Sequence, residues 1–156
     1  MSDFTFELKV TDPRVHDWGL PDYATPMSAG IDLYACCDAP MFIEPQAKAT
    51  LISSGIALNM HRPDVVAMIY ARSGLGHKKG LVLGNGTGVI DADYQNTIFI
   101  STWNRNPKGS DPIEINPGDR IAQLVFLPVL QPKLTLVDDF KTETERGLGG
   151  FGSTGI

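Results

Sequence analysis

Apolar and polar residues alternate at the start of the chain, where residues 4–10 read Phe-Thr-Phe-Glu-Leu-Lys-Val. Successive side chains of a β-strand point to opposite faces, so this period of two predicts a strand with one buried face. Short apolar runs, separated by clusters of Gly, Pro, Asn and Asp, follow at residues 31–35, 49–52, 56–59, 65–70, 81–83, 97–103, 121–127 and 134–137. Many short strands with turn residues between them predict an all-β sandwich, barrel or jelly roll.

Helix is predicted at residues 73–79, where Gly74, Gly76 and Gly80 limit it to one or two turns. The chain has 156 residues, the length of one ordinary domain, and we find neither an internal repeat nor a linker in it. We therefore expect a single β domain over residues 1–145. Residues 146–156 differ in kind, because five glycines around one aromatic residue cannot pack as a regular element.

The charge balance narrows the choice of ligands. The chain carries 13 basic and 18 acidic residues, which gives a net charge of −5, and its longest basic run is Lys78–Lys79. This balance disfavours binding to nucleic acid or another polyanion over a broad surface. A phosphate that this chain handles should therefore be small and locally held.

The two cysteines and the N-terminus indicate where the chain works. Cys36 and Cys37 are neighbours, so they cannot supply a disulfide framework and are too few for a zinc site. The N-terminus lacks the basic and apolar regions of a signal peptide, and the most apolar stretch, residues 124–130, is short and contains Pro128. We expect a soluble protein of the reducing cytoplasm, with no membrane partner.

Five segments combine glycine with polar side chains that are capable of chemistry. They are Ala29-Gly-Ile-Asp-Leu-Tyr-Ala35, Ala71-Arg-Ser-Gly-Leu-Gly76, Gly88-Val-Ile-Asp-Ala-Asp-Tyr-Gln-Asn96, Gly118-Asp-Arg-Ile-Ala-Gln-Leu-Val125 and Arg146-Gly-Leu-Gly-Gly-Phe-Gly-Ser-Thr-Gly155. In this order and spacing they resemble the five motifs of the trimeric deoxyuridine triphosphate nucleotidohydrolases, the dUTPases. One such motif arises easily by chance, whereas five in register are specific. Residues 12–14, 76–78 and 83–85 further resemble the bacterial branch of that family.

The resemblance implies a fold and a reaction. The fold would be an antiparallel β jelly roll, or distorted barrel of the β-clip type, that forms a homotrimer with active sites shared between subunits. The reaction would be hydrolysis of dUTP to dUMP and pyrophosphate by Mg²⁺-assisted, in-line attack of water on the α-phosphorus. It would lower dUTP, limit uracil in DNA and supply dUMP for thymidylate synthesis. Periodicity by itself supports only the all-β part.

Two segments are candidates for binding phosphate. In Arg72-Ser73-Gly74 a guanidinium fork, a hydroxyl and an approachable backbone N–H suit phosphate oxygens, although the triplet alone would be read as a surface arginine before a turn. Gln123 is a polar residue on an apolar strand and therefore needs a partner. The resemblance makes Arg72, Ser73 and Gly74 contacts to the α and β phosphates, and Gln123 a further phosphate ligand.

Asp91 is the candidate general base. Apolar residues enter a turn at Gly88 and acids occupy its tip, which taken alone suits a plain β-hairpin. Hydrolysis needs a group that accepts a proton from the attacking water, and a carboxylate can do this. The resemblance gives this part to Asp91, together with a contact to the sugar 3′-hydroxyl, and it sets the Tyr94 ring against C2′ so that ribose is excluded. For Asp93 we expect only a role in the turn.

The base must be told from cytosine and thymine by paired donors and acceptors. The resemblance assigns this reading to Asn85 and to the backbone of Val89, Ile90 and Asp91. At Gly-Asn-Gly, Asn85 alone would be read as a left-handed turn residue. Phe99 on the following strand could line the same pocket or belong to the core.

A triphosphate chelates Mg²⁺ through its own oxygens, so no direct protein ligand is expected. The resemblance gives Asp32 a contact to the metal through water, or support of the phosphate-binding arginines. Asp119 and Arg120 are interpreted as structural, a turn residue and an ion pair.

The glycine-rich tail is either a frayed terminus or an arm that closes over a bound ligand. By resemblance Arg146 would grip the γ-phosphate and Phe151 would cover the uracil. Gly152, Ser153 and Thr154 would donate hydrogen bonds to terminal phosphate oxygens.

The chain departs from the family pattern at Ala71, where Pro is frequent, and at Asn96, where Gly commonly follows the motif. Asn can adopt the left-handed conformation of glycine, so neither change removes a ligand. Two alternatives remain: a dCTP deaminase of the same superfamily, and a dUTP-sensing protein that regulates a partner. A lectin-like jelly roll is disfavoured by the phosphate-type motifs.

Overall fold

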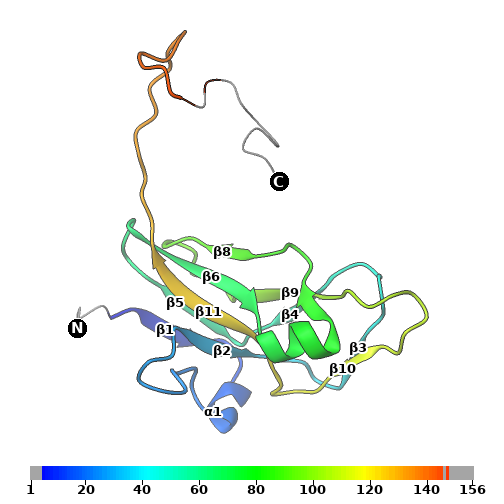
Figure 1. Cartoon of the computed structure of the whole chain (residues 1–156). Helices are drawn as coiled ribbons and strands as arrows, with labels where there is room; N and C mark the ends of the chain where they lie inside the picture. Colours follow the sequence, from blue (N-terminus) through cyan, green and yellow to red (C-terminus); the bar gives the residue numbers. More distant parts are fainter. Residues whose placement is uncertain (1–4, 146, 148–156) are drawn as a thin grey trace.

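The computed structural model describes residues 5–145 and 147, and within them the named strands pair with one another only in antiparallel fashion (Figure 1). A four-stranded sheet has the order β2 (Gly30–Tyr34), β11 (Arg120–Pro128), β6 (Val65–Ala71) and β8 (Gly88–Ile90). A three-stranded sheet has the order β4 (Thr50–Ser53), β9 (Phe99–Asn104) and β7 (Leu81–Leu83), and two pairs join β1 (Glu7–Val10) to β5 (Ile56–Asn59) and β10 (Ile113–Ile115) to β3 (Met41–Ile43). The predicted all-β, antiparallel class is confirmed.

One hydrophobic core holds the sheets together, and its residues come from alternate positions along the strands. Leu33 on β2, Ile69 on β6 and Leu124 on β11 are fully or almost fully buried, as are Ile52 on β4 and Ile100 on β9. All five belong to a single cluster, because each strand turns alternate side chains inward. Burial of apolar surface therefore fixes the register of the sheet that carries the candidate chemistry.

The sequence pattern did not predict four elements of the structure. These are the helix α1 (Arg14–Trp18) and the strands β3, β8 and β10. Each strand has only three residues, too few to display a period of two, and β8 was interpreted as the start of a turn. Pro13 and Asp12 stand before α1, and the Asp12 carboxylate accepts the Arg14 backbone N–H at 3.0 Å, so a helix-start signal was present.

The predicted turn of helix after Arg72 is present as a short π-helix, η1 (Leu75–Lys79). Gly74 precedes it in a right-handed conformation, and Gly80 ends it in the left-handed conformation at φ +80°. The glycines thus limit the helix as expected.

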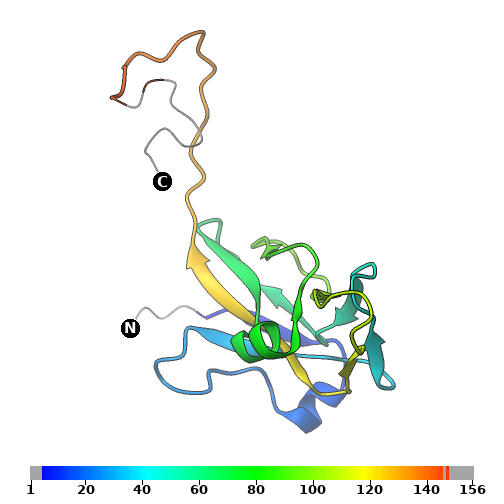
Figure 2. The ribbon, with the colours of Figure 1, turned by 45° about the vertical axis from the view of Figure 1, so that its right-hand side comes forward.

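Residues 129–145 leave the end of β11 and run away from the β body in both views (Figures 1 and 2). The strand predicted at residues 134–137 is wrong, because this segment has no neighbouring strand with which to pair. Leu130, Leu134, Leu136 and Phe140 are 88–97% exposed. This segment therefore exposes large apolar side chains that do not pack against the β body.

The cysteines are buried and free, and burial raises the pKa of the Cys36 thiol to about 11. A thiol with a raised pKa is a poor nucleophile and metal ligand, so Cys36 acts as a core residue. Across the part of the chain that the structure describes, no helix is long and apolar enough to cross a membrane.

Gly55 is required by close packing, and its replacement gives a stability prediction. Its φ is +73°, and an added Cβ would overlap the Cys36 sulfur and lie 2.6 Å from Val15 Cγ2. We expect Gly55→Ala to lower the free energy of unfolding by about 3 kcal/mol, from backbone strain and overpacking together. Urea denaturation at one fixed protein concentration measures this loss.

Gly109→Ala is the matched control for Gly55→Ala. Gly109 has φ +90° but open space around it, so the same substitution there carries backbone strain alone. We expect a loss of about 1 kcal/mol. Equal losses at Gly55 and Gly109 would contradict the packing argument.

Candidate active site

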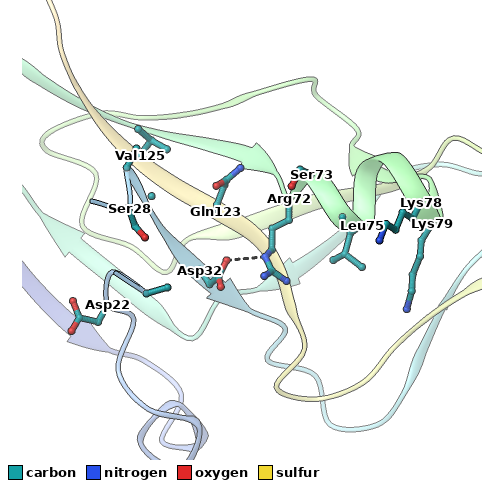
Figure 3. Close-up of a pocket in the computed structure, with 14 residues that line it drawn as sticks. Asp22, Ser28, Asp32, Arg72, Ser73, Leu75, Lys78, Lys79, Gln123 and Val125 are labelled. Atoms are coloured by element: carbon teal, nitrogen blue, oxygen red, sulfur yellow. Dashed lines mark ion pairs between the residues drawn. The ribbon is translucent and has the colours of Figure 1, made fainter. Parts of the chain in front are cut away.

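A cleft of about 530 Å³ opens beside the four-stranded sheet (Figure 3). It is lined by Asp22, Ala24, Ser28, Ala29, Gly30, Asp32, Arg72, Ser73, Gly74, Leu75, Lys78, Lys79, Gln123 and Val125. These residues come from the loop before β2, from β2 and β11, from the turn between β6 and η1, and from η1 itself. Segments far apart in the sequence therefore meet in one cleft.

Strand register brings the polar side chains of the cleft together. Asp32 on β2 lies opposite Gln123 on β11, and Gln123 lies opposite Tyr70 on β6. Residues directly opposite one another share a face of the sheet, so Asp32 and Gln123 face the same side. Arg72 follows the last residue of β6 and joins them in the cleft.

Two guanidinium groups converge on the Asp32 carboxylate. Arg72 Nε lies 2.8 Å from Asp32 Oδ1, and Arg120 Nη1 lies 3.2 Å from Asp32 Oδ2. Arg72 Nη1 also donates to the backbone carbonyl of Arg120 at 3.0 Å. The second terminal nitrogen of Arg72, Nη2, makes no hydrogen bond to the described residues, so its N–H groups can donate to an anion.

Gln123 is held in place by a neighbouring backbone group. Its Nε2 donates to the carbonyl of Ala71 at 3.1 Å, which meets the expectation that a polar residue on this strand needs a partner. The contact links β11 to the residue just before Arg72. One amide N–H and the side-chain carbonyl of Gln123 remain for a ligand.

The turn after Arg72 supplies small and basic groups. Ser73 and Gly74 are exposed and line the cleft. A Cβ built on Gly74 meets nothing within 4 Å, so packing within the chain does not require glycine there. Lys78 and Lys79, at the end of η1, also line the cleft and add positive charge (Figure 3). Sequence reasoning did not predict that this lysine pair lines a site, and it missed Asp22 and Ser28.

The candidate base-reading residues lie in the turn that connects β7 to β8 and on β8, the edge strand of the four-stranded sheet. Asn85 is exposed in the turn, Val89 is 60% exposed and Ile90 is half-buried. The left-handed residue of this turn is Gly86 at φ +75°, so the left-handed reading of Asn85 is wrong. The side-chain amide of Asn85 makes no hydrogen bond among the described residues.

Asp91 and Tyr94 follow β8 in an exposed turn. The Tyr94 backbone N–H donates to the Asp91 carbonyl at 3.1 Å, and the Tyr94 hydroxyl donates to the Thr97 carbonyl at 3.0 Å. The Asp91 carboxylate has no hydrogen bond or ion pair within the described residues. The Tyr94 ring is thus fixed at its hydroxyl end, while the Asp91 carboxylate stays free to accept a proton.

Asn96 does not take the conformation that was expected of it. It has no positive φ, and its side-chain oxygen accepts the Thr97 N–H at 2.7 Å. The amide therefore stabilises the turn by a hydrogen bond to the next residue, and the left-handed conformation expected for it is wrong. Phe99 on β9 is 48% exposed, which removes the alternative that it is a core residue.

The predicted site residues form two groups in one chain. Asp32, Arg72, Ser73, Gly74 and Gln123 line the cleft described above. The second group, which we call the hairpin group after the β-hairpin that the sequence suggested at Gly88–Asp91, does not line it. The hairpin group consists of Asn85, Val89, Ile90, Asp91, Tyr94 and Phe99. Arg146, Phe151, Gly152, Ser153 and Thr154 lie outside the described residues.

Comparisons with known proteins identify the family of the chain. The dUTPase family model matches residues 16–155. The deoxyuridine 5′-triphosphate nucleotidohydrolase of Xanthomonas campestris pv. campestris (strain B100) is 55% identical over 153 residues, which is 97% of each chain. That of Xanthomonas oryzae pv. oryzae (strain MAFF 311018) is 54% identical over 97% of this chain and 96% of its own.

Solved structures give the same answer for the fold. A dUTPase variant of Staphylococcus bacteriophage 80alpha, determined with dUpNHpp, matches with a TM-score of 0.83 and 27% identity over 97% of this chain and 99% of its own. A dUTPase variant from phage phi11 of S. aureus, described with a structural Mg(II) ion, matches with a TM-score of 0.73 and 24% identity over 88% of this chain and 99% of its own. The family match, the relatives and the cleft lead to one conclusion: the chain belongs to the dUTPase family.

Proposed function

We propose that this chain hydrolyses dUTP to dUMP and pyrophosphate, with the triphosphate in the Arg72 cleft and Asp91 as the general base. The observation that carries the proposal is the set of groups in the cleft of a dUTPase family member: a guanidinium nitrogen, a hydroxyl and a carboxamide beside two lysines. These donors suit the oxygens of a phosphate chain. The reaction would keep dUTP low, limit uracil in DNA and provide dUMP for thymidylate synthesis in the cytoplasm.

On the phosphate side, Arg72 and Ser73 donate to the α and β phosphates, and Gln123 donates its remaining amide N–H. Glycine at position 74 fits this role, because the chain itself leaves its Cβ position open and only an approaching ligand would make use of the space. The fixed contacts of Arg72 to Asp32 and to the Arg120 carbonyl mean that little side-chain entropy is lost on binding.

The donor set of the cleft suits Mg²⁺ held mainly by the substrate. Among residues 5–145 and 147, no group of three or more His, Cys, Asp or Glu could hold a metal. Asp32 offers one carboxylate in the cleft, which would reach the ion through water. When bound, Mg²⁺ neutralises charge on the triphosphate oxygens.

The hairpin group reads the nucleoside in this proposal. Asn85 and the backbone of Val89, Ile90 and Asp91 supply donors and acceptors to uracil, and Phe99 lines the pocket. The Tyr94 ring, held by its bond to Thr97, forms a wall against C2′ that leaves no room for a ribose hydroxyl. The Asp91 carboxylate takes a proton from the water that attacks the α-phosphorus in line with the leaving pyrophosphate.

We further propose a homotrimer in which each active site is shared. The hairpin group does not line the cleft of its own chain, which supports a site in which the hairpin of one copy lies beside the cleft of another. The exposed apolar residues of the segment 129–140 provide surface for such an assembly. Residues 146–156 then form an arm, attached to the 1–145 domain, that closes a site. In that arm Arg146 holds the γ-phosphate, Phe151 covers the uracil, and Gly152, Ser153 and Thr154 donate to phosphate oxygens.

The double substitution Leu134→Asp and Leu136→Asp tests the assembly. The two leucines are 88% and 97% exposed, and their spacing places them on one side of an extended segment. Burial of each leucine in a partner contributes about 1.5–3 kcal/mol, so charges there should dissociate the trimer and abolish turnover. Light scattering after size-exclusion chromatography measures the mass.

The control for the leucine pair is Thr135→Asp, which introduces a charge between the two leucines on the other side of the segment. It should leave the trimer and its activity intact. A wild-type chain that is monomeric and fully active would refute the assembly.

The function itself is tested by pyrophosphate release with Mg²⁺ from dUTP, run beside dCTP, dTTP and UTP at equal concentration. Selective turnover of dUTP is the expected result. Ammonia release from dCTP would identify a deaminase instead. Binding of dUTP without cleavage would favour a dUTP-sensing regulator.

A further inference from the structure

The Asp32 carboxylate is paired with two positively charged side chains instead of one. Arg72 binds one of its oxygens and Arg120 the other, at 2.8 Å and 3.2 Å. Two cations share one anion, so the trio keeps one positive charge in excess. Without the Arg120 side chain, Asp32 and Arg72 would form a neutral pair at the mouth of the phosphate cleft.

Arg120 is placed by a turn that the rest of the fold holds firmly. It is the first residue of β11, opposite Tyr34 on β2 and beside an irregularity in the register before Ala122. The preceding turn is closed by the Asp119 carboxylate, which accepts the Asn116 backbone N–H at 2.8 Å. Gly118, at φ +83°, packs so closely on the Trp18 indole that a Cβ would lie 2.9 Å from it.

Arg120 is linked to Arg72 in two independent ways, one direct and one through Asp32. The backbone carbonyl of Arg120 accepts a hydrogen bond from Arg72 Nη1 at 3.0 Å, and the Arg120 side chain acts only through Asp32. A substitution of the side chain leaves the carbonyl in place. Arg72 therefore stays oriented, and only the charge balance around Asp32 changes.

We propose that Arg120 is a positioning residue for the phosphate site. By sharing the Asp32 carboxylate it leaves the Arg72 guanidinium under-neutralised, so that Nη2 attracts a phosphate oxygen more strongly. The inference rests on the proposed function, because it takes the Arg72 cleft as the phosphate site. It gives Arg120 a part in binding, whereas its sequence context suggested a structural ion pair alone.

The test compares Arg120→Gln with the wild-type chain on two ligands, the non-hydrolysable triphosphate dUpNHpp and 2′-deoxyuridine, which has no phosphate. The side chain of Arg120 is 54% exposed, so the effect is screened, and we expect dUpNHpp affinity to fall about three- to tenfold. Deoxyuridine affinity should not change. Arg120→Lys keeps the charge and should recover most of the loss.

Salt and a second substitution separate charge from structure. The difference between wild type and Arg120→Gln should shrink between about 0.05 M and about 0.5 M salt, because screening weakens the charge effect. It should also be much smaller in an Asp32→Asn background, where there is no anion to share. Lys9→Gln, which removes one positive charge from the exposed face of β1, should leave both affinities unchanged.

The binding measurements show whether Arg120 acts on the phosphate site. An equal loss on dUpNHpp and deoxyuridine, or no loss on either, overturns the inference, as does an effect that persists undiminished in Asp32→Asn. Wild-type binding of dUpNHpp is a separate question: if the wild-type chain does not bind it, the proposed function fails before Arg120 is tested.

Discussion

Replacement of Asp91 with Asn should lower the turnover of dUTP by about 10²–10⁴-fold, the range found when a general base is removed. Asparagine keeps the size of the side chain and the turn that the Tyr94 N–H closes on the Asp91 carbonyl. It cannot accept the proton of the attacking water. Because the carboxylate is exposed and makes no contact within the described residues, the fold should be unaffected.

The measurements are the rate of pyrophosphate release and the affinity for dUpNHpp. Affinity should stay within about threefold of wild type, since the substitution removes a chemical step and no phosphate contact. Asp93→Asn, two residues further along the same turn, is the control and should retain activity. Turnover by Asp91→Asn near the wild-type rate would show that another group takes the proton.

Replacement of Arg72 with Met is the second large effect that we expect. A hydrogen bond to a charged group contributes about 1.5–3 kcal/mol, so loss of the phosphate contact should reduce kcat/KM by about 10- to 100-fold. Methionine retains the apolar stem that packs beside the sheet. Arg120 remains to pair with Asp32, so no unpaired carboxylate is left in the cleft.

Arg72→Lys distinguishes geometry from charge. Lysine keeps the positive charge but cannot bind Asp32, the Arg120 carbonyl and a phosphate with three nitrogens at once. We expect an activity between those of wild type and Arg72→Met. Steady-state kinetics with dUTP gives both values, and full activity in Arg72→Met would exclude this cleft as the phosphate site.

The fold was predictable wherever a strand was long enough to show its pattern. Residues 56–59 and 81–83 were predicted with the bounds that β5 and β7 have. The strands β3 and β10, with three residues each, show too little alternation to be recognised. Residues 134–137 have the pattern of a strand but no partner strand among the described residues. An apolar run predicts that its side chains will be buried, but it does not predict which surface will cover them.

The candidate site was predictable as a set of residues and not as an arrangement. Arg72 and Gln123 were identified through the resemblance of their motifs to the dUTPase family, and the strand register then placed Gln123 opposite Asp32. Arg72 and Arg120 both contact the Asp32 carboxylate, and Arg120 is 88 residues away from Asp32 in the sequence. No local sequence pattern predicts a contact over that separation. Asn96 illustrates the reverse: residue type suggested a left-handed backbone, and a side-chain hydrogen bond took its place.

A mixture of two impaired variants tests the central claim, that the cleft of one copy works with the hairpin of another. Asp91→Asn has an intact cleft and Arg72→Met an intact hairpin, so a mixed trimer can contain sites with both groups intact. Random mixing at equal concentration, after unfolding and refolding together, should restore about a quarter of the wild-type activity, because one ordered pair of neighbours in four is competent. Activity that stays at the level of the separate variants would show that Asp91 and Arg72 act within a single chain.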